Sequence, residues 1–256
     1  MQSLPTLAGT AALVTGASSG IGHATARSLA SRGAAVALAA RRTERLEELA
    51  SDIRSGGGSA VVIPADVTDE KQAREAVART VEVLGRLDTL VNNAGVMLLG
   101  PIVDAPVEEW RRMVELNLVG LLHCTHAALP HLIDAAATGQ RRVADVVNIS
   151  SVAGRVARNG NGVYTATKHA VGAFSESLRQ ELAGRHVRVS LVEPGATATE
   201  LASHNRPEIR ERIAGRFEGV ERLTSEDIAD TVEFIVSRPW HMAVNEVLVR
   251  PTEQEG

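Results

Sequence analysis

Short apolar segments alternate with longer amphipathic segments along almost the whole chain. The apolar segments predict buried strands at residues 10–15, 34–40, 59–64, 89–91, 143–149, 187–192 and 245–249. The segments between them predict helices at residues 21–32, 43–55, 69–84, 106–134, 162–184 and 228–237. Strands that alternate with helices are typical of a parallel sheet covered on both faces. We therefore expect an α/β, doubly wound sheet of about seven parallel strands.

Cap residues and a proline indicate where several of these helices begin or are interrupted. Thr43, Thr68 and Thr224 stand where N-caps are expected. Pro130 interrupts the long 106–134 helix, and a polar connector is expected at residues 135–142. No linker or internal repeat divides the chain, so we expect a single domain over residues 1–256.

Composition narrows the class of protein. The chain has 256 residues, of which 44% are hydrophobic and only 2% aromatic, so Ala, Val and Leu must build the core. The net charge of −4 is interspersed, which gives no nucleic-acid footprint. Cys124, the only cysteine, fits a reducing compartment and a core position, and we expect a cytoplasmic protein. Residues 1–9 lack signal-peptide features, and no uncharged apolar run approaches a membrane span.

A glycine-rich loop follows the first strand and opens the first helix. It reads Gly16-Ala17-Ser18-Ser19-Gly20-Ile21-Gly22, and its spacing is G-x-x-x-G-x-G rather than the commoner G-x-G-x-x-G. Glycines also serve plain tight turns. Between a strand and a helix, however, such a loop can hold a pyrophosphate on backbone N–H groups, so we expect a Rossmann-type nucleotide site.

The end of the second strand bears on cofactor choice. An NAD site usually places Asp or Glu there, whereas this chain has Ala40, Arg41 and Arg42. A guanidinium can pair with a 2′-phosphate, so we expect NADP(H), with Arg41 favoured for the phosphate and Arg42 left open. The alternative is that both arginines are solvated charges at the start of a helix.

Residues 148–168 carry candidate catalytic chemistry. A strand delivers Ser151, and the following helix carries Tyr164 and Lys168 on one face, four residues apart. Tyrosine has an ordinary pKa of about 10, and a neighbouring cation favours the phenolate. A hydroxyl, a phenol and an ammonium together suit proton transfer at a carbonyl or alcohol centre.

Small and polar residues follow the other strands, where a cofactor can approach closely. They are Asp66, Val67, Asn93, Ala94, Gly95, Pro194, Gly195, Thr197 and Thr199. A charged segment at about 199–222 resembles a lid over the site, and such lids exclude water on closing. Candidate substrate contacts are Met97, Val152, Arg155 and Leu201.

Two of these assignments have alternatives. Arg155 could meet a substrate carboxylate, but a solvated or interface arginine is at least as good an account. His123, His126 and His131 share one helix without a carboxylate cluster, so we assign them structural or surface positions and expect no metal.

Four motifs in order resemble the short-chain dehydrogenase/reductase family. They are Thr15-Gly16-x-x-x-Gly20-x-Gly22, Asn92-Asn93-Ala94-Gly95, Ser151 with Tyr164-x-x-x-Lys168, and Pro194-Gly195. The resemblance implies that Tyr164 is the general acid/base, that Lys168 lowers its pKa and holds the nicotinamide ribose, and that Ser151 binds the substrate oxygen. It further implies that Asn117 completes a tetrad by positioning a water beside Lys168. The implied cofactor contacts are Gly16, Gly20 and Gly22 to pyrophosphate, Asp66 to adenine, and Pro194, Gly195 and Thr199 to nicotinamide, with Asn93 bracing the central strands.

The same resemblance implies a function. Residues 39–42, 97–101, 153–156 and 250–252 are similar to the bacterial branch of secondary metabolism that contains clavulanic acid dehydrogenase. We expect an NADP(H)-dependent ketoreductase acting on a small aldehyde, ketone or alcohol, assembled as a homotetramer or homodimer. The alternatives are an NAD-linked hydroxy-acid dehydrogenase and a nucleotide-sensing binding protein without turnover.

Overall fold

The computed structural model describes residues 7–103, 105–217 and 219–255, and in that part of the chain seven parallel strands form one sheet. The strand order is β3-β2-β1-β4-β5-β6-β7, so it reverses between β1 and β4. The strands are β1 (Ala11–Thr15), β2 (Ala35–Ala40), β3 (Ser59–Pro64), β4 (Thr89–Asn92), β5 (Ala144–Ile149), β6 (Val187–Pro194) and β7 (Glu246–Val249). In open α/β sheets ligands bind at such a reversal, beyond the carboxyl ends of the strands.

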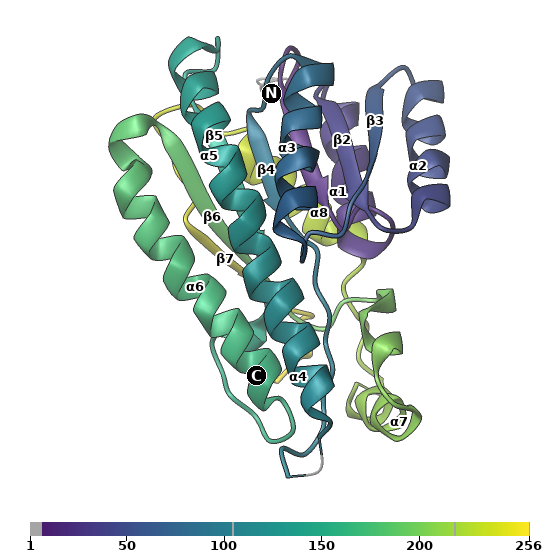
Figure 1. The fold of residues 1–256 in the computed structure, drawn as a ribbon. Coiled ribbons are helices and arrows are strands. Elements are labelled where there is room, and N and C mark those ends of the chain that lie inside the picture. Colours follow the sequence, from purple (N-terminus) through teal and green to yellow (C-terminus); the bar gives the residue numbers. More distant parts are fainter. Residues whose placement is uncertain (1–6, 104, 218, 256) are drawn as a thin grey trace.

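Helices connect the strands (Figure 1). The α-helices are α1 (Gly20–Ser31), α2 (Thr43–Ser55), α3 (Glu70–Leu84), α4 (Val107–Val114), α5 (Gly120–Thr138), α6 (Gly162–Leu182), α7 (Pro207–Arg216) and α8 (Ser225–Val236). The shorter turns are η1 (Glu115–Val119), η2 (Val152–Gly154), η3 (Ala183–Arg185) and η4 (Glu200–His204). Each predicted strand and helix is therefore present, and the α/β doubly wound fold is confirmed.

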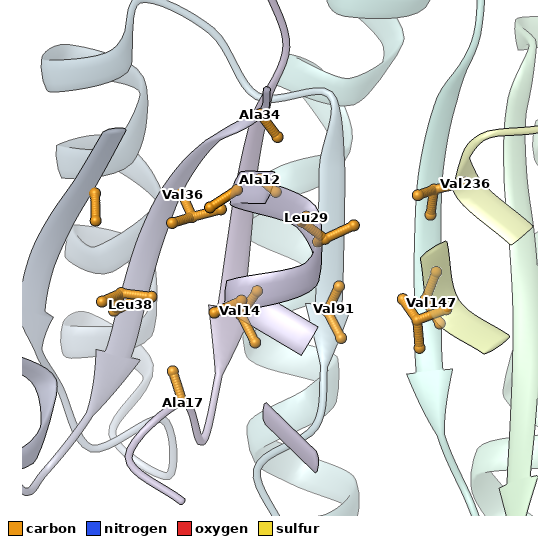
Figure 2. Packing of buried hydrophobic residues seen from close by; sticks show 14 of the residues in the cluster. Ala12, Val14, Ala17, Leu29, Ala34, Val36, Leu38, Val91, Val147 and Val236 are labelled. Atoms are coloured by element: carbon orange, nitrogen blue, oxygen red, sulfur yellow. The ribbon is translucent and has the colours of Figure 1, made fainter. Parts of the chain in front are cut away.

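The helices cover the two faces of the sheet in two groups. α1, α2 and α8 pack on one face, and α3, α5 and α6 pack on the other. Side chains alternate between the faces of a strand, so Ala12 and Val14 of β1 join the first cluster while Leu13 joins the second. Figure 2 shows Ala12 and Val14 with Leu29 of α1. Small aliphatic side chains build both cores, as the composition predicted.

The long predicted helix differs from its prediction in detail. α4, η1 and α5 follow one another without a break, and η1 is a π-helical turn. Pro130 lies inside α5, which continues to Thr138. The expected connector over 135–142 is therefore wrong in its first half, because the helix extends through Ala135 and Ala136, which are buried against the core.

Two of the three predicted caps are wrong. α2 begins at Thr43 itself, with Arg42 in the cap position. At α3 the cap is Asp69, whose carboxylate accepts a hydrogen bond from the Gln72 N–H at 2.9 Å. Thr68 instead donates to Asp66. Thr224 does cap α8, in a reciprocal capping box with Asp227.

One helical stretch among the described residues, 107–138, could cross a membrane by length and composition alone. An 18-residue window within it has a mean hydropathy of 1.2, so this helix is more apolar over its length than we expected from the sequence. Cys124, Ala128 and Leu132 of this stretch are buried against the sheet. A helix that packs on a sheet needs such an apolar face. The prediction about a leader falls largely on residues 1–6, which lie outside the described residues.

Candidate active site

A cavity of about 410 Å³ opens at the carboxyl ends of the strands. Most of the predicted site residues line it. They are Gly16, Ser18, Ser19, Gly20, Ile21, Arg41, Arg42, Asp66, Val67, Asn93, Ala94, Gly95, Met97, Ser151, Val152, Tyr164, Lys168, Pro194, Gly195, Thr197, Thr199 and Leu201. Gly22, Asn117 and Arg155 do not line the cavity. The topology thus brings the glycine loop and the Ser–Tyr–Lys group to one place.

Ser151, Tyr164 and Lys168 converge inside this cavity. Ser151 follows β5 and begins η2, while the other two lie in the first two turns of α6. Tyr164 and Lys168 are 5% and 7% exposed, so their polar ends are almost withdrawn from water. The Ser151 hydroxyl accepts from the Ala153 N–H at 3.1 Å and faces the Tyr164 phenol closely enough to lower its pKa. The Lys168 Nζ donates to the Ile149 carbonyl at 2.8 Å and lies 5.9 Å from the centre of the Tyr164 ring.

Without a bound ligand, burial has the largest effect on the pKa values of Tyr164 and Lys168. It raises the pKa of Tyr164 to about 12, although the Ser151 hydroxyl acts in the opposite direction. It also lowers the pKa of Lys168 to about 8. The expectation that Lys168 lowers the Tyr164 pKa is therefore not met in the chain alone, because burial disfavours the charged form of both groups.

Asn117 supports the site from behind. It lies in the π-helical turn η1 and is 2% exposed. Its amide oxygen accepts from the Val96 N–H at 2.8 Å, and its amide nitrogen donates to the Val96 carbonyl at 2.9 Å and to Thr167 at 3.2 Å. The side chain therefore ties the segment after β4 to α6. The water that it was expected to position stays a prediction.

Each glycine of the loop occupies a position that another residue would strain or crowd. Gly16 and Gly20 have φ of 66° and 56°, in the left-handed region that favours glycine. A Cβ on Gly22 would lie 2.4 Å from the Asn93 amide nitrogen, which donates to the Thr15 carbonyl at 3.0 Å. Asn93 thus links the ends of β1 and β4. Gly22 allows this packing and does not itself line the cavity, which differs from its expected pyrophosphate contact.

The two arginines after β2 have different partners. Arg42 donates to the Ser18 hydroxyl at 3.0 Å and to the Ser19 hydroxyl at 2.6 Å. Arg41 is directed towards Asp66, with a distance of 3.7 Å between Nη1 and Oδ2. Arg42, rather than the favoured Arg41, is therefore the arginine that contacts the glycine loop. The two adjacent arginines differ only in the direction of their side chains, and the sequence does not reveal that direction.

Arg155 is held away from the cavity. Its Nε donates to both carboxylate oxygens of Glu193 at 2.8 Å, and its Nη2 also pairs with Glu246. Glu193 is 1% exposed, so it needs this partner. The idea that Arg155 meets a substrate carboxylate is therefore wrong, because its guanidinium already neutralises a buried acid.

The lid segment lies over the cavity and contacts the loop after β4. Asn205, between η4 and α7, accepts from the Leu99 N–H at 2.7 Å and donates to the Met97 carbonyl at 2.9 Å. Asn205 is 6% exposed, and sequence reasoning missed it because its partners lie about a hundred residues away. Figure 1 shows α7 projecting from the sheet. Of the expected 199–222 segment, residue 218 lies outside the described residues.

Sequence reasoning also missed part of the cavity wall. Arg158, Ile213, Arg216, Phe217, Arg222 and Gln254 line it in addition to the predicted residues. Gln254 accepts a hydrogen bond from the Ala196 N–H at 2.8 Å and so contacts the loop after β6. The only sequence signal for the others was their place in the Ser151–Tyr164 loop and in the lid.

Metal-binding and thiol chemistry have no site in the part of the chain that the structure describes. No three or more His, Cys, Asp or Glu residues lie together there in a way that could hold a metal ion. Cys124 is buried, which raises the pKa of its thiol to about 12. It therefore fills the core, as expected.

Several known proteins are similar to this chain in amino-acid sequence. A family model described as short chain dehydrogenase matches residues 10–210. The chain is 37% identical to a serine 3-dehydrogenase of Rhizobium radiobacter over 243 residues, which is 94% of each protein. It is 40% identical over 248 residues to a glycine betaine reductase of Emericella nidulans, a match that covers 97% of this chain and 19% of that protein.

Solved structures of related proteins have the same fold as this chain. The closed form of a serine dehydrogenase complexed with NADP+ has a TM-score of 0.88 and 32% identity, covering 96% of this chain and 97% of that one. A short chain dehydrogenase from Burkholderia cenocepacia in complex with NADP has a TM-score of 0.81 and 31% identity, covering 95% and 97%. The fold, the cavity and these matches lead to one conclusion: the chain belongs to the short-chain dehydrogenase/reductase family of oxidoreductases.

Proposed function

We propose that the chain is an NADP(H)-dependent oxidoreductase that reduces an aldehyde or ketone to an alcohol, or runs the reverse reaction. One observation carries the proposal. Ser151 and Tyr164 line a single cavity together with Lys168 and the glycine loop. Proton-transfer groups and a dinucleotide cradle in the same cavity are what such a reaction needs.

The residues present fit a dinucleotide. Gly16 and Gly20 hold the loop in left-handed conformations that bring backbone close to a ligand. Ser19 makes no capping hydrogen bond to α1, so the first N–H groups of that helix are available to an anion. Arg42 is directed over the same loop by Ser18 and Ser19. These features support a pyrophosphate at the start of α1 and a 2′-phosphate near Arg42.

The chain's own residues then perform the acid–base chemistry. When bound, NADPH supplies a hydride to the carbonyl carbon. Ser151 donates a hydrogen bond to the carbonyl oxygen, and Tyr164 passes its phenolic proton to that oxygen as negative charge develops there. Lys168 favours the phenolate that remains. Because both are buried, the attraction between ammonium and phenolate is stronger than it is in water.

An NADP-linked reaction has more support than the NAD-linked alternative. The two residues directly after β2 are Arg41 and Arg42, where an NAD site usually has a carboxylate, and two guanidinium groups suit a 2′-phosphate. The serine dehydrogenase structure that this chain resembles was solved with NADP+. A nucleotide-sensing protein without turnover would not need the buried Tyr164 and Lys168, whose burial costs free energy.

Consumption of NADPH on a panel of aldehydes and ketones tests the proposal. Tyr164→Phe is expected to lower kcat by a hundredfold or more, on the order of the usual general acid–base contribution, while the Kd for NADPH stays within about twofold. Arg42→Ala is expected to raise the KM for NADPH far more than the KM for NADH. Full activity of Tyr164→Phe, or no NADPH consumption by the wild type on any carbonyl, would refute the assignment.

Assembly and location remain predictions of the sequence. A homotetramer or homodimer is expected through the long helices α5 and α6, and a monomer in light scattering would contradict it. A cytoplasmic location agrees with Cys124 being a free, buried thiol, which a reducing compartment preserves.

A further inference from the structure

Three arginines that line the cavity have no acidic partner in the part of the chain that the structure describes. Arg158, Arg216 and Arg222 form no ion pair among the described residues, whereas Arg42 and Arg155 each pair with a glutamate. An arginine that lines a cavity without a counter-ion is poised to receive one from a ligand. This group, named here the arginine trio, is therefore a candidate anion site.

The arginine trio comes from both sides of the cavity. Arg158 lies in the loop that joins Ser151 to Tyr164. Arg216 ends α7, and Arg222 is the last residue of the lid segment. The guanidinium carbons of Arg216 and Arg222 lie 5.8 and 5.7 Å from the centre of the Phe217 ring. Both cations thus lie within reach of the same aromatic ring, which attracts each of them.

Arg158 lies close enough to Arg216 to influence its charge. Partial burial, and then the positive charge of Arg158, lower the pKa of Arg216. Like charges that approach in this way destabilise each other unless an anion joins them. The chain brings them together across the gap between the catalytic loop and the lid, which is where a substrate would lie.

None of the ion pairs among the described residues joins a carboxylate to the arginine trio. Among the residues that line the cavity, the acidic ones are Asp66 and Glu200. Asp66 lies near Arg41, and Glu200 pairs with Arg42 and Arg45 at the glycine-loop end. The two acidic residues that line the cavity are therefore placed beside other arginines, and the described residues give the arginine trio no counter-charge.

We propose that the substrate is a small hydroxy or oxo carboxylic acid, whose carboxylate binds to the arginine trio while its carbonyl or hydroxyl lies at Ser151 and Tyr164. This inference rests on the proposed oxidoreductase function and adds the substrate class. Guanidinium and carboxylate match in shape and form paired, charge-assisted hydrogen bonds. Met97, Val156 and Ile213 line the same cavity and suit an apolar carbon chain between the two ends.

Matched acids and esters test the charge requirement without any variant. The wild type is assayed with NADPH on glyoxylate, succinate semialdehyde and their methyl esters. We expect kcat/KM to be at least tenfold higher for the acids than for the esters. Glyceraldehyde and glyceraldehyde phosphate form a second pair, which asks whether a phosphate monoester is preferred instead. Equal rates on acids and esters, or preference for the phosphate alone, would overturn the proposal.

Variants then locate the anion site. Arg158→Gln and Arg216→Gln are each expected to raise the KM for the better acid at least tenfold, which corresponds to about 1.4 kcal/mol. The KM for its ester and the Kd for NADPH should stay within about twofold of the wild-type values. Arg210→Gln, on the exposed side of α7, is the matched control and should change none of these values. Should either variant unfold, Arg158→Lys or Arg216→Lys replaces it.

The outcomes separate this inference from the function on which it rests. No NADPH consumption on any compound would remove the proposed function. Turnover that is unaffected by Arg158→Gln, Arg216→Gln and esterification would leave the function in place and remove the carboxylate site. A raised Kd for NADPH in the arginine variants, with an unchanged KM for the acid, would assign the arginine trio to the cofactor and also overturn the inference.

Discussion

The guanidinium of Arg42 and the carboxylate of Glu200 lie 2.8 Å apart, measured from Nη1 to Oε2. Arg45 contacts the other oxygen of Glu200 at 2.6 Å. Arg42 also contacts the glycine loop, and Glu200 begins η4 at the start of the lid segment. The arginine proposed for the 2′-phosphate is thus already paired with a carboxylate.

Removing that carboxylate is expected to strengthen NADPH binding. Glu200→Gln frees both arginines, and because exposed pairs contribute up to about 1 kcal/mol, the Kd for NADPH should fall about two- to fivefold. The Kd for NADH should change little. Nucleotide fluorescence titration measures both, with the exposed Glu47→Gln on α2 as control. Equal effects on the two nucleotides would mean that Glu200 does not compete with the phosphate.

Lys168 makes the stability of the fold depend on pH. Its pKa is lowered from 10.5 to about 8, so between these values the unfolded chain binds a proton that the folded chain has released. The free energy of unfolding contributed by Lys168 therefore rises with pH across that window, by about 3 kcal/mol at most.

The chain offers a clean control for this effect. Its only other lysine is Lys71, which is exposed and lies 3.7 Å from Glu75. Urea unfolding at several pH values should show the wild type gaining stability over Lys168→Met as pH rises from about 8 towards 10.5. Lys71→Met should run parallel to the wild type. Parallel curves for Lys168→Met as well would mean that Lys168 stays fully protonated in the folded chain.

Tyr164 can be titrated alone because it is the only tyrosine of the chain. Its pKa is raised by burial to about 12, so phenolate absorbance should begin only above the ordinary range. Ser151→Ala should delay it further, since the Ser151 hydroxyl favours the phenolate. Ser150→Ala, whose hydroxyl bonds the Lys168 carbonyl instead, should leave the titration unchanged. An ordinary midpoint in the wild type would contradict the burial of the phenol.

Gly22→Ala is expected to destabilise the fold through Asn93. The added methyl would lie 2.4 Å from the Asn93 amide nitrogen and 2.5 Å from the Gly16 carbonyl, so one of them must move. Overpacking of this kind costs about 1–3 kcal/mol. Thermal unfolding should show a lower Tm than for Gly184→Ala, where a Cβ would meet nothing within 4 Å. A Tm equal to that control would show that the loop accommodates the methyl.

Arg155→Met is expected to lower stability by about 1–3 kcal/mol, because it leaves the buried carboxylate of Glu193 without its partner. Glu246→Gln removes only the more exposed of the two partners and should cost less than about 1 kcal/mol. Denaturant midpoints distinguish the two variants. A selective loss of activity on acids in Arg155→Met, with unchanged stability, would return this arginine to the substrate site.

The fold and the catalytic group could be predicted because both depend on local pattern. Strand and helix periods follow directly from the order of apolar residues, and Tyr164 and Lys168 come together through helix spacing alone. The choice between Arg41 and Arg42, the role of Arg155 and the Asn205 contact could not be predicted. Each depends on a side-chain direction set by a partner far away in the sequence, such as Glu200, Glu193 or Met97.

The π-helical turn at Glu115–Val119 acts as a spacer in the register of a long helix. A π turn holds about one residue more than an α turn, and one residue corresponds to about 100° of rotation. Deleting a single residue there would give a regular helix in which Asn117 and Cys124 could no longer both face their present neighbours. The extra residue lets one helix satisfy two geometries at once: a polar face directed at the loop after β4 and an apolar face directed at the sheet.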